Sequence, residues 1–148
     1  MMVVIAREGT GTQAVSLGRV ADSTMISRRY LEQLAMALKK AALLRSVAGR
    51  KGGYLLARPA REIRIGEIIE ASIGPLSIVE CVDKPDDCLK TDFCECRLFY
   101  MLISKRLSQV FNEYSLADMT DRNWTKEISR ELARKEPRTG SRPSAGAS

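Results

Sequence analysis

The chain has 148 residues, 45% of them hydrophobic and 28% charged, with a net charge of +6 and no histidine. These values fit one globular domain with an extension, and they exclude a disordered chain or a collagen-like repeat. Because the chain has no histidine, Ser-His-Asp catalysis, Cys-His catalysis and a His-ligated zinc are also excluded. The longest apolar run, Met1–Ala6, is far shorter than the roughly 18 residues of a spanning helix. We therefore expect a cytoplasmic protein without membrane contact. Because no acid–base group of catalytic type stands out, we also expect that it is not an enzyme.

Two helices with a short break between them are predicted in the first third of the chain, after the end of an amphipathic helix over residues 1–8. Ser16 and Ser27 are typical N-cap residues. Each precedes a run in which apolar residues recur at helical spacing. We therefore expect helices over 16–23 and 28–42.

A β-hairpin is predicted next. Residues 43–47 and 54–57 are strand-like, and three glycines with the basic pair Arg50 and Lys51 lie between them, which is the composition of a turn. Helix, break, helix and hairpin in this order indicate a winged helix-turn-helix. We expect residues 1–60 to form this DNA-binding domain, so that the fold is mainly α with a small β-hairpin wing.

The rest of the chain predicts a connecting helix within residues 61–80, a polar cysteine-bearing loop over 81–96, and a long helix over 97–118. The long helix has a broad apolar face, as expected of a dimerisation helix. Residues 119–148 are interpreted as an extension that begins with a helix over 121–136. Its last twelve residues are rich in Pro, Gly, Ser and Ala and are typical of a disordered tail.

Basic charge is concentrated in the predicted DNA-binding domain. Residues 1–60 hold ten basic and three acidic side chains, whereas residues 61–100 hold five and nine. A recognition helix contacts base edges in the major groove with its N-terminal residues, and basic residues at a hairpin tip can reach the DNA backbone. A merely solvated basic surface is the alternative interpretation. The residues that we expect to contact DNA are Ser27, Arg28, Arg29, Tyr30, Gln33, Arg50 and Lys51.

All four cysteines lie in one segment, at Cys81, Cys88, Cys94 and Cys96. In a reducing compartment such a cluster indicates metal binding or redox chemistry rather than structural disulfides. The spacing matches neither the paired knuckles of a zinc finger nor a thioredoxin-type C-x-x-C. Soft thiolates suit an iron–sulfur cluster, while a zinc site, a thiol switch and inert cysteines remain as alternatives.

Several stretches together resemble the Rrf-two family of winged-helix transcriptional regulators, which includes IscR-like and NsrR-like proteins. The matching stretches are Val15–Leu17, Ile26–Leu34, Lys51–Pro59, Ile68–Ala71, Gly74–Leu76 and the cysteines at 81, 88 and 94. The resemblance covers about residues 1–118. It implies a homodimer that binds a double-stranded DNA operator, usually as a repressor, with an affinity controlled by a 2Fe-2S or 4Fe-4S cluster. A zinc-stabilised or thiol-switched regulator and a winged-helix protein-interaction module stay open as alternatives.

The resemblance implies that Cys81, Cys88 and Cys94 are cluster ligands. Some members carry a histidine where this chain has Arg97, and arginine stays protonated and does not ligate metals. Other members recruit a residue near the N-terminus of the partner subunit. Three interpretations of Cys96 stay open: a fourth ligand, a substitute for Cys94, or a spare thiol.

Three further departures from the family pattern have physical consequences. The chain starts partway into the family's first helix, so either the start codon is misplaced or that helix is truncated. Met25 stands where the family often has a turn glycine, which would strain the backbone if φ is positive there. Arg64 replaces the Ser or Thr that caps the connecting helix.

Overall fold

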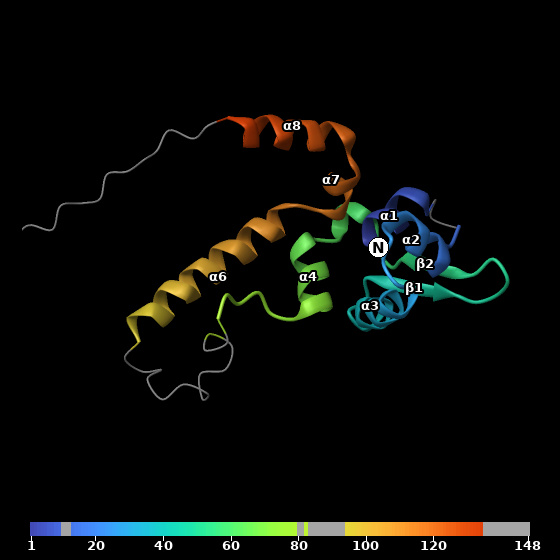
Figure 1. The fold of residues 1–148 in the computed structure, drawn as a ribbon, viewed down its shortest axis with the longest axis horizontal. Helices are drawn as coiled ribbons and strands as arrows, with labels where there is room; N and C mark the ends of the chain where they lie inside the picture. The colour runs from blue at the N-terminus through green and yellow to red at the C-terminus, as the bar shows by residue number, and fades with distance from the viewer. Residues whose placement is uncertain (10–12, 80–81, 83–93, 135–148) are drawn as a thin grey trace, which may run out of the picture.

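Helices make up most of the chain in this computed structural model, which describes residues 1–9, 13–79, 82 and 94–134. In chain order the elements are α1 (Met2–Glu8), α2 (Leu17–Thr24), α3 (Arg28–Lys40), β1 (Leu44–Val47), β2 (Gly53–Leu56), the 3-10 turn η1 (Ala60–Glu62), α4 (Ile65–Ile73), α6 (Glu95–Glu113), α7 (Leu116–Thr120) and α8 (Arg122–Ala133). Figure 1 shows α1 to β2 gathered in one body, from which α6 and α8 project to the same side. The expected fold class, mainly α with a small hairpin, is confirmed.

Side-chain caps begin α2 and α3. The Ser16 hydroxyl accepts a hydrogen bond from the backbone N–H of Arg19 at 3.2 Å, and the Ser27 hydroxyl accepts one from the N–H of Tyr30 at 3.4 Å. Each bond satisfies one of the N–H groups that have no partner within the first helical turn. Both helices therefore start where the serines predict, and they pack against each other.

The turn between α2 and α3 holds a methionine in left-handed backbone. Met25 has φ 57° and ψ 22°, and its N–H donates to the carbonyl of Ala21 at 2.8 Å. This conformation costs a residue with a side chain roughly 1–2 kcal/mol. The Met25 side chain is 90% exposed, so little packing offsets that cost. The strain expected from the missing glycine is present.

α3 ends two residues earlier than expected, in a Schellman motif. The N–H of Leu43 donates to the carbonyl of Leu38 at 2.9 Å, and the N–H of Ala42 donates to the carbonyl of Lys39 at 3.0 Å. Ala42 has φ 54°, and the two leucines are buried, as is typical of this motif. The chain therefore turns directly into β1, and Ala42, the last residue of the helix expected over 28–42, is exposed.

The hairpin is tied to the segment before α2. β1 and β2 are antiparallel, with Leu44 opposite Leu56 and Val47 opposite Gly53. Val15 exchanges two backbone hydrogen bonds with Tyr54, at 2.9 and 3.0 Å. A Cβ at Gly53 would overlap the carbonyl of Val15, so glycine permits this close approach.

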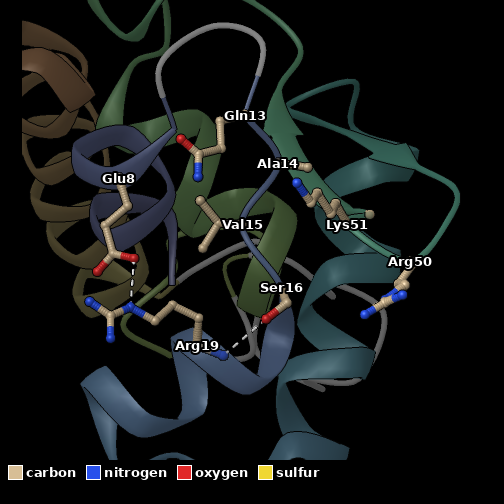
Figure 2. A pocket seen from close by; sticks show the side chains of 9 residues that line it. Glu8, Gln13, Ala14, Val15, Ser16, Arg19, Arg50 and Lys51 are labelled. Carbon is tan, nitrogen blue, oxygen red and sulfur yellow. Dashed lines mark hydrogen bonds and ion pairs between the residues drawn. The ribbon is translucent and has the colours of Figure 1, made fainter.

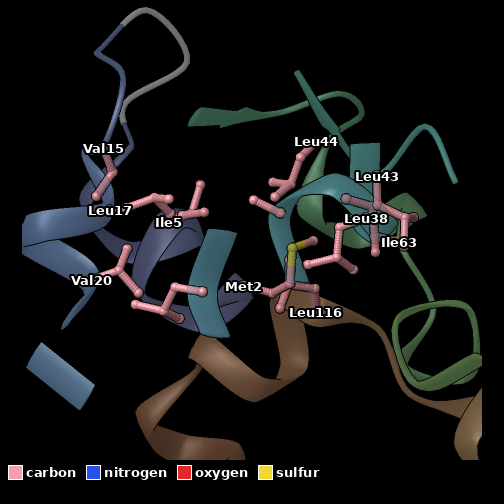
Figure 3. Close-up of a cluster of buried hydrophobic side chains, with 12 residues drawn as sticks. Met2, Ile5, Val15, Leu17, Val20, Leu38, Leu43, Leu44, Ile63 and Leu116 are labelled. Carbon is pink, nitrogen blue, oxygen red and sulfur yellow. The ribbon is translucent and has the colours of Figure 1, made fainter. Parts of the chain in front are cut away.

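The core joins segments that are far apart in the sequence (Figure 3). Its buried members are Met2, Ile5, Val15, Leu17, Val20, Leu31, Ala35, Leu38, Leu43, Leu44, Ile63 and Leu116. Leu116 in α7 is fully buried, and its N–H donates to the carbonyl of Ile63 at 2.8 Å. The N–H of Ile65 donates to the carbonyl of Tyr114 at 3.0 Å. The winged-helix core is therefore completed by residues beyond the expected boundary at residue 60.

The single helix expected over 97–118 is wrong, because the chain forms α6 and then a separate α7. Ser115 starts α7 with a capping box, in which the Asp118 carboxylate accepts from the Ser115 N–H at 2.7 Å and from its hydroxyl at 2.8 Å. These bonds, the backbone one first, hold the pKa of Asp118 below its ordinary value. The extension then continues as α8, and the expected tail from residue 137 lies outside the described residues.

α4 and α6 cross closely beside the core. Gly66 faces Asn112, whose side-chain amide would overlap a Cβ at position 66. Arg64 occupies the N-cap position of α4, and the Glu67 carboxylate accepts from its backbone N–H at 3.3 Å. The same carboxylate accepts from the Arg58 guanidinium at 2.8 Å. Glu67 thus satisfies the N–H of the cap residue and anchors the start of α4 to Arg58.

Replacing Met25 by glycine should stabilise the protein by roughly 0.5–1 kcal/mol, the left-handed cost less the entropy that glycine adds to the unfolded chain. Urea denaturation at equilibrium measures the change. Met25→Ala is the matched control, because it removes the same exposed side chain and keeps the strain. Equal stabilisation by both variants would contradict the backbone explanation.

Candidate nucleic-acid interface and cysteine segment

One face of α3 is buried and the other is open to solvent. Leu31, Ala35 and Leu38 lie in the core. The residues expected to contact DNA from this helix are all exposed: Ser27, Arg28, Arg29, Tyr30 and Gln33. They lie at its N-terminal end, where the backbone N–H groups also favour an anion. The structure therefore brings these five predicted residues together on one surface.

The two arginines at the start of α3 differ in their surroundings. The Arg28 guanidinium lies 3.3 Å from the Glu32 carboxylate, with both side chains more than half exposed. Such a surface pair contributes little, about 0–1 kcal/mol, and is easily exchanged for another anion. Arg29 has no ion-pair partner within the described part of the chain. Arg29 is thus the more available of the two for a base edge.

The hairpin tip and the start of α2 border a basic hollow of about 590 Å³ (Figure 2). Arg50 and Lys51 reach it from the hairpin, and Ser16 and Arg19 reach it from α2. The guanidinium of Arg19 donates to the carboxylate of Glu8 at 2.9 Å, and this bond raises the pKa of Arg19 above its ordinary value. Three cations beside a helix N-terminus form a surface suited to phosphate.

Ser16 and Arg19 were not among the expected contact residues. The signal was available in the sequence, because a capping serine followed by arginine within the first helical turn occurs at the start of α2 as it does at the start of α3. The second example marks another surface for phosphate rather than for bases, since it lies beside the hairpin tip.

The two described cysteines, Cys94 and Cys96, lie at the start of α6, away from the exposed face of α3 (Figure 1). Cys94 is the N-cap residue of α6, and Cys96 lies in its first turn, so Cys96 is helical rather than part of the loop expected over 81–96. Both thiols are free, and Cys94 is half-buried whereas Cys96 is exposed. Cys81 and Cys88 lie outside the described residues. Within the described ranges, no group of three Cys, Asp or Glu side chains is placed to hold a metal.

α6 exposes an unusual amount of apolar surface. Ser104 is buried, and this side of the helix lies against α4. Large apolar side chains on its other sides are exposed, among them Leu98 at 68%, Phe99 at 60%, Leu102 at 53% and Val110 at 46%. Contiguous apolar surface of this kind indicates a partner. In the described part of the chain, no helix is long and apolar enough to span a bilayer.

Comparison with known proteins agrees with this geometry. The family model for Rrf2, described as an iron-dependent transcriptional regulator, matches residues 1–122. The HTH-type transcriptional regulator IscR of Sodalis glossinidius is 34% identical over 119 residues, which is 80% of this chain and 70% of that protein.

Two solved structures share the fold. IscR of T. potens superposes with a TM-score of 0.62 at 31% identity and covers 92% of this chain and 84% of its own. CymR (YrzC), the global cysteine regulator of B. subtilis, superposes with a TM-score of 0.63 at 29% identity. The superposition covers 80% of this chain and 86% of the CymR chain. The winged-helix architecture predicted from the sequence is therefore confirmed.

Base reading should depend on the arginines at the start of α3. Arg29→Ala should weaken binding to a specific duplex, selected from random sequences, by about 1–3 kcal/mol and relax its sequence preference, because a bidentate contact to guanine is lost. Arg28→Ala should follow the same pattern, and Lys40→Ala at the far end of the helix is the control. Fluorescence anisotropy on specific and random duplexes checks this. Equal weakening on both would reduce the arginine to a phosphate contact.

The hairpin tip should act through phosphates. Lys51→Ala should weaken binding to every duplex and lower the slope of log affinity against log salt by about one unit, because one phosphate contact and its released counterions are lost. Titrations at several salt concentrations measure the slope, with Lys105→Ala on α6 as the control. A slope that stays at the unmutated value would remove Lys51 from the interface.

Proposed function

The chain belongs to the Rrf2 family of transcriptional regulators, and from that premise we propose that it is a homodimeric, cytoplasmic repressor. In this proposal, an iron–sulfur cluster held by its cysteines controls its affinity for a double-stranded operator. The observation that carries the proposal is the path of α6, which begins at two thiols and ends, through α7, in the core of the DNA-binding domain (Figure 1).

Backbone contacts support the coupling between the two ends of this path. The start of α4 and the end of α6 are joined by an isolated bridge between Arg64 and Ser115. Two hydrogen bonds, Ile65 to Tyr114 and Leu116 to Ile63, flank that bridge. A displacement at the start of α6 would therefore be transmitted to the winged helix as a rotation of the domain.

A dimer makes such a rotation consequential. Two recognition helices read half-sites roughly 34–36 Å apart, so a small change of spacing is costly for binding. The exposed apolar side chains of α6, among them Leu102 and Val110, support pairing of two copies through this helix. Isologous pairing would place the two winged helices on either side of a two-fold axis.

The donor set supports iron–sulfur ligation. Cys94 and Cys96 offer accessible thiols at the start of α6, and thiolate sulfur is the ligand that such clusters prefer. Cys81 and Cys88 would complete the set. A bound cluster supplies a centre that responds to oxidation and to small reactive molecules. The residues' own part is to position the four sulfurs and to couple their geometry to α6.

The cluster should require Cys88, and Cys96 should decide the fourth ligand. Protein purified without oxygen, or reconstituted with iron and sulfide, should be brown, and its spectrum separates 2Fe-2S from 4Fe-4S. Cys88→Ala should be colourless yet folded, because the described winged-helix core contains no cysteine. Cys96→Ala should bleach or shift the spectrum if Cys96 is a ligand and should leave it unchanged if the thiol is spare.

A zinc-stabilised or thiol-switched DNA-binding regulator is the second candidate, since two accessible thiols lie two residues apart at the start of α6. Reconstituted protein without a cluster but with one zinc per chain, or with DNA affinity that follows dithiol oxidation, would favour it. Failure of the unmutated protein to bind any duplex would instead favour a protein-interaction module.

A further inference from the structure

We propose that α8 is an arm that packs on a second copy of this chain, where it covers the N-terminal half of the partner's α6. This inference rests on the proposed homodimer and extends it beyond α6. α8 begins at Arg122, where the match to the family model ends.

α8 has little of its own subunit to pack on. It is 12 residues long and none of its residues is fully buried, although Trp124 and Ile128 are half-buried. Helices of this length are marginal in water unless their apolar side is covered. The apolar residues Trp124, Ile128 and Leu132 recur every four residues and share one side of the helix. Leu132, at the outer end, is 81% exposed.

The base of α8 is nevertheless held firmly. The Trp124 ring packs edge-on against Tyr114, with 5.5 Å between centroids and 64° between planes. Tyr114 is the residue that ends α6, and the Asp121 carboxylate caps α8 by accepting from the N–H of Asn123 at 2.8 Å. The apolar side of α8 thus starts beside the end of α6, and both helices project to the same side of the core (Figure 1).

The area that a stable dimer must bury indicates that a second copy covers the apolar side of α8. α6 has 19 residues, which gives a length of about 28 Å and, at a helix width of about 10 Å, a contact strip of a few hundred Å². A stable interface buries about 800 Å² on each partner. A dimer that used α6 alone would be marginal, and two α8 arms, one from each copy, add apolar surface at both ends of the strip.

Symmetry indicates where the arm would lie. If the two-fold axis crosses α6, the paired helices run antiparallel, so the start of one lies against the end of the other. α8 then extends over the start of the partner's α6. That end carries the most exposed apolar pair of the helix, Leu98 and Phe99. The apolar side of α8 and this pair would be covered together.

Charge is complementary as well. A hollow of about 490 Å³ between α1 and α8 is lined by Arg7, Arg122, Lys126 and Arg130, and none of the four has an ion-pair partner within the described residues. The sequence leading into α6, residues 80–95, holds six acidic and two basic side chains. In the antiparallel arrangement the exposed Glu95, in the first turn of the partner copy's α6, lies toward the cationic side of the arm.

The test uses the full chain and its dimer dissociation constant, measured by sedimentation. The double variant Ile128→Ser/Leu132→Ser should raise that constant at least about tenfold, because apolar burial is lost twice per dimer. The matched control Glu127→Gln/Glu131→Gln alters another side of the same helix and should stay within about twofold. Val110→Asp places a charge in the α6 interface and should give monomers.

Trp124 supplies a second readout, since it is the one tryptophan of the chain. Its emission should shift to the red as the unmutated dimer is diluted through dissociation, and it should not depend on concentration in the Val110→Asp monomer. Adding Leu132→Ser alone to that monomer should leave its thermal unfolding unchanged, because this side chain is 81% exposed in the single subunit.

The outcomes separate the arm from the dimer. Unmutated protein that is monomeric at all concentrations overturns the homodimer of the proposed function. An unmutated dimer that the serine changes do not weaken, with Trp124 emission unchanged on dissociation, overturns the arm and leaves the α6 dimer intact. A Leu132→Ser change that destabilises the Val110→Asp monomer would show that the outer end of α8 packs on its own subunit, and would also overturn the arm.

Discussion

The burial of Leu116 against Ile63 is the contact on which the rest of the arrangement depends. A residue from beyond the long helix α6 fills the core of a domain whose other members come mainly from the first 44 residues. Because protein cores are close-packed, a fully buried side chain cannot shift without disturbing its neighbours. α6 therefore cannot swing freely as an appended rod. Its orientation is fixed at one end by the winged helix, and only its other end, with Cys94 and Cys96, is available to sense a change.

Charge is also distributed unevenly along the chain. Cations gather on the surfaces formed by α3, the hairpin tip and the start of α2, while acidic residues dominate the sequence that leads into α6. The cationic surfaces thus lie at the winged-helix end of α6, and Cys94, Glu95 and Cys96 lie at its other end (Figure 1). A rigid helix between the two ends transmits a displacement, while charge interactions over its length are screened by salt.

Local chemistry made most elements predictable, and non-local packing accounts for the errors. Ser16 and Ser27 mark helix starts that the structure reproduces to the residue. The predicted end of α3 is two residues too late, because the left-handed residue that ends the helix is Ala42 rather than a glycine. The start of α6 was placed too late because Cys94 makes no side-chain capping bond that a sequence pattern could reveal. The burial of Leu116 depends on a contact with a residue 53 positions earlier, and no local periodicity contains that information.

Residues with a strained backbone conformation lie on both sides of the recognition helix, α3. Met25 precedes it and Ala42 follows it, and each adopts a left-handed conformation that costs a residue with a side chain roughly 1–2 kcal/mol. Such strain persists where the surrounding structure determines the conformation more strongly than local preference does. Here the determining contacts are the fully or almost fully buried Leu31, Ala35 and Leu38 of α3 itself. The core therefore sets the position and direction of α3, and the turns on either side adapt to it. A helix positioned in this way presents Arg28 and Arg29 at a fixed place relative to α6, which is the condition for a displacement of α6 to alter DNA binding at all.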